Sequence, residues 1–118
     1  MIEQIVLEYL SEQMSVPVLT ELPEVPSEAY PTMPELFVVL EKVGGGMTDQ
    51  IEAGSIAIQS YSLRSLYEAA QLDKEARAAM YGIIELNEIS EVRFSSSYNH
   101  TDTRTKRYRY QSVFDIHF

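Results

Sequence analysis

The first part of the chain predicts a helix, a short strand and an extended loop. Five apolar residues recur at helical spacing on one face, opposite polar and acidic positions: Ile2, Ile5, Val6, Tyr9 and Leu10. The helix ends before Pro17, and residues 16–20 predict a short edge strand. Residues 21–35 hold four of the five prolines, so we expect an extended loop without regular structure there.

The middle of the chain predicts a hairpin followed by a capped helix. Residues 36–43 are apolar on both faces, as in a central strand, and residues 51–61 alternate as a second strand. The glycine-rich residues 44–50 between them predict a long, flexible connection. Ser65 and Glu68 match a capping box, in which each side chain accepts a hydrogen bond from the other residue's backbone amide. The helix is predicted to end near Leu86, and its apolar face comprises five residues: Ala69, Leu72, Ala76, Met80 and Ile83.

The last third of the chain alternates with the period of two that strands show. One face of a strand over residues 92–98 is expected to hold four residues: Val92, Phe94, Ser96 and Tyr98. A polar loop over 99–106 leads to a closing strand at 107–118. Six of its residues are expected to face the core: Tyr108, Tyr110, Ser112, Phe114, Ile116 and Phe118.

This order of elements predicts one α+β domain over residues 1–118. We expect a two-layer sandwich in which two helices cover one face of a mostly antiparallel sheet of four to five strands. The chain has no cysteine, which excludes disulfides, thiolate catalysis and cysteine-based metal sites. The first ten residues carry no basic residue, unlike a signal peptide, and the longest apolar run is residues 36–40. We therefore expect a soluble protein that is not secreted.

The formal net charge of -9 is distributed unevenly along the chain. Residues 1–60 contain ten acidic residues and one basic residue, whereas residues 61–118 contain eight of each. An acidic surface repels the phosphate backbone and cannot release counterions from DNA, so the composition argues against a protein that grips nucleic acid.

One polar stretch contains the residue types of a nucleophilic triad: Ser95, Ser96, Ser97, His100 and Asp102. Triads are assembled by the fold rather than by closeness in sequence, and they need an exposed nucleophile and an oxyanion hole. The chain has no G-x-S-x-G sequence. The pattern therefore favours a polar strand that runs into a loop, and we predict that the protein is not an enzyme.

Other candidate sites are equally weak. His100 and His117 are the only histidines, and a metal site would need them to converge with Asp102 or Asp115. Their spacing matches no metal signature, so surface histidines are favoured. The glycines at 44–46 lack the Lys-Ser/Thr of a phosphate-binding loop, and the glycosylation sequon at 99–101 has meaning only in a secreted protein. The sequence predicts no metal and no cofactor.

Four basic residues gather near the end of the chain, interleaved with two tyrosines: Arg104, Lys106, Arg107 and Arg109. Aromatic interleaving can indicate binding of single-stranded nucleic acid. A contact between the basic face of one copy and the acidic first half of the next is a second interpretation, and simple solvated charge is a third. The strand pattern places the tyrosines on the core face and the arginines on the opposite face.

Three stretches, in this order, resemble the small tail-terminator (tail-completion) proteins of siphophages and prophages. They are LFVVLEKVGGG at 36–46, SIAIQSYSLRSLYEAAQLDKEARAAM at 55–80, and the closing TKRYRYQSVFDIHF at 105–118. The N-terminal helix followed by VPV also fits. The proline-rich loop at 21–35 is longer than in that family.

The resemblance implies a structural α+β subunit that forms a ring, commonly hexameric, on the head-proximal end of the tail tube. Such a ring ends tube polymerisation and joins the tail to the head, and DNA passes through it without specific binding. The implied partners are other copies of the chain, the major tail tube protein and the head-tail connector. The implied location is the virion tail or neck, assembled in the host cytoplasm. The alternatives are another head-tail joining or minor capsid protein, or a small cytoplasmic ligand-binding or regulatory domain.

Overall fold

The computed structural model describes residues 2–48, 51–99, 101 and 107–118, with the backbone alone at 45–48, 51 and 52. The elements follow in the order α1 (Ile2–Gln13), β1 (Val18–Leu19), β2 (Leu36–Thr48), β3 (Ile51–Ser62), α2 (Leu66–Tyr81), a 3-10 helix η1 (Gly82–Glu85), β4 (Glu91–Asn99) and β5 (Tyr108–His117). The order agrees with the sequence pattern, and the α+β class is confirmed.

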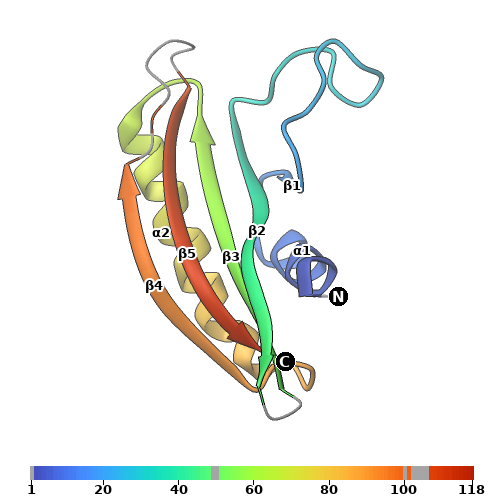
Figure 1. The fold of residues 1–118 in the computed structure, drawn as a ribbon. Helices are drawn as coiled ribbons and strands as arrows, with labels where there is room; N and C mark the ends of the chain where they lie inside the picture. The colour runs from blue at the N-terminus through green and yellow to red at the C-terminus, as the bar shows by residue number, and fades with distance from the viewer. Residues whose placement is uncertain (1, 49–50, 100, 102–106) are drawn as a thin grey trace.

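The strands form one five-stranded sheet in the order β1-β2-β3-β5-β4 (Figure 1). All neighbouring pairs run antiparallel except β1 and β2, which run parallel through Val18↔Val38 and Leu19↔Val39. The predicted edge strand before the proline-rich loop is therefore present, although it has only two residues. The two-layer arrangement is confirmed, because both helices pack on the same face of this sheet.

The main core lies between the helices and the sheet. α1 contributes Ile2, Val6 and Leu10, which recur every four residues. The five predicted apolar positions of the second helix are all buried in α2 and η1, and the strands complete the core with Val38, Leu40, Ile56, Ile58, Phe114 and Ile116. Burial of these side chains is the main source of stability, at roughly 1.5–3 kcal/mol for each large one.

The hairpin is longer than the sequence predicts. β2 continues to Thr48, and antiparallel pairs run from Gly44↔Ser55 to Thr48↔Ile51. The prediction of a flexible connection is thus wrong for residues 44–48, while residues 49 and 50 lie outside the described part. Val43 is the extra residue of a bulge between Lys42 and Gly44. Pairing between strands uses backbone groups and needs no alternation of apolar side chains. The glycine run of β2 can therefore continue the ladder because β3 supplies its backbone partners.

The second helix is shorter than predicted, because α2 ends at Tyr81 and η1 follows. Gly82 caps α2, and its backbone N–H donates to the carbonyl oxygens of Ala79 and Met80. The Tyr9 hydroxyl donates to the same Ala79 carbonyl at 2.7 Å. α1 therefore contacts α2 at the turn where the α-helix gives way to the tighter 3-10 helix.

The side chains of β4 do not keep one alternation. Phe94 pairs with Phe114, but Ser96 pairs with Val113, so Ser95 is the extra residue of a bulge. Beyond the bulge Ser97 bonds to Asp73 of α2, and Tyr98 bonds to Gln111 on the opposite face. The prediction of one shared face for Val92, Phe94, Ser96 and Tyr98 is therefore wrong after Phe94, since a bulge reverses the alternation.

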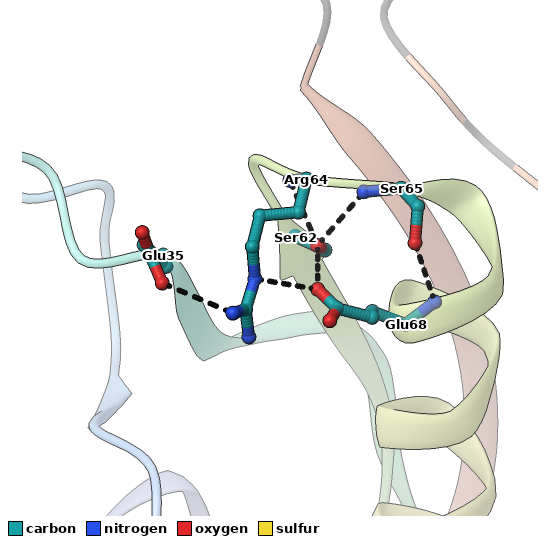
Figure 2. A network of polar contacts seen from close by, with 5 residues as sticks. All are labelled: Glu35, Ser62, Arg64, Ser65 and Glu68. Carbon is teal, nitrogen blue, oxygen red and sulfur yellow. Dashed lines mark hydrogen bonds and ion pairs between the residues drawn. The ribbon is translucent and has the colours of Figure 1, made fainter.

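The capping box is half formed (Figure 2). Ser65 Oγ accepts a hydrogen bond from the Glu68 amide at 3.1 Å, as predicted. The Ser65 amide instead donates to Ser62 Oγ at 3.3 Å, and the Glu68 carboxylate accepts from Ser62 and Arg64. Arg64 also lies 3.4 Å from Glu35, so the start of α2 is tied to the end of the proline-rich loop.

That loop has no helix or strand between Leu19 and Leu36, as predicted. Within it the Ser27 amide donates to the Tyr30 carbonyl at 2.9 Å, and the Tyr30 amide donates to Ser27 Oγ at 3.0 Å. The Val25–Pro26 peptide bond is cis. In the part of the chain that the structure describes, no helix has the length and apolar character needed to cross a bilayer.

Candidate interaction surfaces

The face of the sheet opposite the helices carries a small apolar cluster. The rings of Phe37 and Tyr61 stack in parallel, with centroids 4.8 Å apart, and Val39 lies beside them. Leu19 and Met33 cover the cluster from β1 and from the proline-rich loop. The alternation of β2 explains this cluster, because a strand that is apolar on both faces must bury its second face under something other than the helices.

A line of polar side chains crosses this open face from β2 to β4. Gln59 of β3 donates to Glu41 of β2 and to Gln111 of β5, both at 3.1 Å. Gln111 in turn donates to the Tyr98 hydroxyl of β4 at 2.6 Å. Amide groups that both donate and accept can link strands in series, so these four side chains fix the relative positions of all four long strands. No single stretch of sequence indicated this network.

Of the predicted basic cluster, Arg109 has the best-defined position. Its guanidinium lies 5.5 Å from the centre of the Tyr61 ring and donates to the Tyr61 hydroxyl at 2.9 Å. It thus sits on the open face, as the strand pattern predicted, but against an aromatic ring rather than extended into solvent. Arg107 is half-buried just before β5, and Arg104 and Lys106 lie outside the described residues. Their role in an inter-subunit contact stays a prediction.

On the helix side, a buried carboxylate connects α2 to two strands. Asp73 is 1% exposed and accepts hydrogen bonds from Ser112 of β5 and from Ser97 of β4, the latter at 3.0 Å. The Arg77 guanidinium lies 3.1 Å from the same carboxylate and 5.7 Å from the Phe94 ring. A buried charge is stable only when it is paired and hydrogen-bonded, and Asp73 meets both conditions. Sequence reasoning missed it because Asp73 is polar, although its spacing from Ala69 and Ala76 places it on the buried face of the helix.

The residues of the hypothetical triad are used differently. Ser97 donates to Asp73, while His100 and Asp102 lie outside the described residues. His117 donates from Nδ1 to Glu91 at 2.8 Å, across the paired ends of β4 and β5. This hydrogen bond lowers the pKa of the Glu91 carboxyl below its ordinary value of 4.5, and the charge of Arg93 adds to the effect.

A shallow hollow lies on the open face beside this pair, lined by Ala53, Gly54, Ser55, Arg93, Asp115 and His117. Ser55 donates to Asp115 at 2.6 Å. Within residues 2–48, 51–99, 101 and 107–118, no three acidic or histidine side chains are arranged to hold a metal ion. The metal site considered from the sequence needs both His100 and His117, and His100 lies outside the described residues.

The charge asymmetry of the sequence becomes an asymmetry across the sheet. α1, β1 and β2 all belong to the first half of the chain and lie at one side of the sheet, whereas β5 and β4 lie at the other (Figure 1). Exposed carboxylates of the first side are spread over α1, the proline-rich loop and β2: Glu8, Glu12, Glu21, Glu24, Glu28 and Glu41. The opposite side combines both signs of charge, with Arg93 beside Glu91 and Asp115 at one end and Arg109 toward the other end of β5. We call these sides the acidic flank and the mixed flank.

Comparison of the chain with models of known protein families and with curated protein sequences gives no match in either set.

Proposed function

We propose that this protein is a structural subunit that assembles head to tail into a ring on the end of a phage tail tube. There the ring ends tube polymerisation and joins the tail to the head. The observation that carries the proposal is the separation of the acidic flank from the mixed flank on opposite sides of one sheet. A subunit with different, complementary sides suits a heterologous contact, which repeats around a closed ring.

The positions of the three resembling stretches support the same proposal. They correspond to β2, to β3 with α2, and to β5, and these elements are in direct contact within the sheet or across the core. The resemblance thus covers the centre of the fold rather than scattered surface segments. The proline-rich loop, which is the departure from the family, lies outside this centre (Figure 1).

The acidity of the protein suits a ring through which DNA passes. Carboxylates facing a bore repel phosphates, so a duplex can slide without being held. The other interpretations place different demands on the same surfaces. A head-tail joining protein would use the same flanks but would act on the capsid side. A ligand-binding domain would self-associate to a different extent when a small molecule is bound.

Tail length tests the proposal. Deletion of the gene in the phage or prophage that carries it should give tail tubes of irregular, extended length without attached heads, and a plasmid copy should restore uniform tails. Tails of normal length without the protein would contradict a terminator, and normal but headless tails would favour a joining protein. A stable dimer whose association depends on a small molecule would favour the regulatory alternative.

A further inference from the structure

We propose that the copies of this chain join edge to edge, so that β4 of one subunit pairs antiparallel with β2 of the next and the sheet continues across the interface. The joint specifies how neighbouring subunits of the proposed ring contact each other. Only the position of the ring on a tail tube rests on the proposed function. Three features of the sheet edges carry it.

The first feature is the edge formed by β4. Of its nine residues, all but Ser95 pair with β5 on one side, and no strand in the described part of the chain pairs with its other side (Figure 1). Soluble proteins protect such edges with proline, charged side chains, bulges or short strands. β4 contains no proline, its charged residues are Glu91 and Arg93, and its bulge at Ser95 leaves residues 91–94 in regular pairing. An edge of this kind is a template for another strand.

The second feature is the opposite edge of the sheet. Within the described residues, β1 pairs with β2 at Val38 and Val39, and no strand pairs with the outer side of β2 at residues 41–44. A notch lies beside this stretch, lined by Glu3, Gln4, Thr20, Leu40, Glu41 and Lys42. The short β1 thus leaves room next to β2 for an incoming strand, with the N-terminal turn of α1 as its floor.

The third feature is charge. The notch contains two carboxylates, and Glu3 Oε1 is buried there with no hydrogen-bond partner among the residues that the structure describes. The Arg93 side chain of β4 is 71% exposed and is held in the structure by Glu91, two residues away on the same strand. Arg93 and Glu41 both project from the open face, so in an antiparallel joint they can stand directly opposite each other. Lys42 projects to the other face and does not oppose Arg93.

The strand directions permit this joint. β2 is antiparallel to β3, β3 to β5, and β5 to β4, so β2 and β4 run in opposite directions. A second copy placed beside the first in the same orientation therefore offers β4 antiparallel to β2, the pairing that gives straight hydrogen bonds. Each copy uses its β4 edge for one neighbour and its β2 edge for the other. The contact therefore repeats from copy to copy, and the assembly closes when the copies form a ring.

Disulfide trapping tests the joint directly, because the chain has no cysteine of its own. In the variant Glu41→Cys/Arg93→Cys the two thiols lie on opposite edges, separated by three strand spacings, about 14 Å. That distance is too great for a bond within one chain. Every disulfide that forms therefore joins two copies. Oxidation should give a ladder of covalent oligomers under denaturing conditions, ending at the copy number of the ring.

Two control variants distinguish this joint from other ways in which two copies could meet. Arg93→Cys alone and the pair Glu12→Cys/Arg93→Cys should give no ladder, since neither places two thiols across the joint. Self-linking of Arg93→Cys would mean that two β4 edges face each other, which overturns the proposal. Failure of the Glu41/Arg93 pair to link, with circular dichroism unchanged, would also overturn it, whether or not rings form. A complete ladder in a protein that does not limit tail length would leave the joint standing and remove the terminator function.

Charge exchange provides an independent measurement. Arg93→Glu should weaken assembly, most strongly at low salt, because two carboxylates then face each other at every joint. Glu41→Lys in the same chain should restore it by reversing the pair. Equal assembly of Arg93→Glu and the unmodified protein at every salt concentration would contradict the proposed register.

Discussion

The hydroxyl of Tyr9 occupies the space that a side chain at position 82 would need. A Cβ atom built on Gly82 would lie 2.6 Å from Tyr9 Oη, closer than such contacts occur. The backbone of Gly82 is right-handed, with φ of -79°, so the requirement for glycine comes from Tyr9 and not from backbone strain. This contact connects α1 to the end of α2, and burial raises the pKa of the Tyr9 phenol, with Glu85 adding to the shift.

Gly82→Ala should therefore destabilise the protein by about 1–3 kcal/mol, the range for an overpacked site. The same substitution in a Tyr9→Phe background should be neutral or stabilising, because the obstructing oxygen is gone and alanine restricts the unfolded chain. A double-mutant cycle by urea unfolding measures the difference. Equal effects of Gly82→Ala in both backgrounds would show that Tyr9 does not set the requirement.

Asp73 is the second site where a single change should matter. Asp73→Ala removes the acceptor of two serine hydroxyls and the partner of Arg77, and we expect a loss of about 3 kcal/mol, at the low end for a broken buried pair. Asp73→Asn should lose less, since one acceptor oxygen remains. Lys74→Ala, at the next and exposed position of α2, is the matched control and should change stability little. Similar urea midpoints for Asp73→Ala and Lys74→Ala would contradict this role.

The Glu91 and His117 pair should give stability a pH dependence. The pKa of Glu91 is lowered in the folded protein, so its contribution is present above the ordinary value of 4.5 and is lost as pH falls through the lower folded value. Glu91→Gln should flatten the fall in melting temperature in that acidic range, whereas Glu88→Gln should leave it unchanged. If the melting temperature of Glu91→Gln fell with pH as steeply as that of the unmodified protein across this range, the assignment would be refuted.

The basic stretch before β5 should contribute to assembly through charge. Because Arg109 packs on Tyr61, the cleaner test is Arg107→Glu, which leaves that contact intact. Exposed pairs contribute about 0.2–1 kcal/mol each, but one reversal recurs at every joint of a ring. Sedimentation should show weaker assembly at low salt than for Lys74→Glu, which makes the same charge change on α2. Identical behaviour of the two variants would leave residues 104–109 as ordinary solvated charge.

Much of the fold could be predicted from periodicity. The buried faces of α1 and α2, the hairpin and the alternation of β5 all follow from where apolar side chains recur. Residue patterns could not predict the bulge at Ser95, because a single unpaired residue leaves no mark on composition yet reverses the faces of Ser97 and Tyr98. The extension of β2 through Gly44 to Thr48 was missed for a similar reason: its partner strand, and not its own side chains, determines it.

The candidate surfaces were less predictable than the fold. The excess of acid in the first half was visible in the sequence, but its position on one flank depends on β1 and β2 lying at one edge of the sheet, with β3 between them and the strands of the second half. The network from Glu41 through Gln59 and Gln111 to Tyr98 joins four separate strands. Contacts of this kind are set by strand order and register, which local pattern does not contain.

Electron microscopy of tails with gold-labelled antibody against this protein tests the central claim most directly. A ring that caps the tail tube should give label at one end only, the end that joins the head, on every finished tail and on headless tails alike. Label along the tube, label confined to the capsid, or tails of uniform length that carry no label would contradict the account.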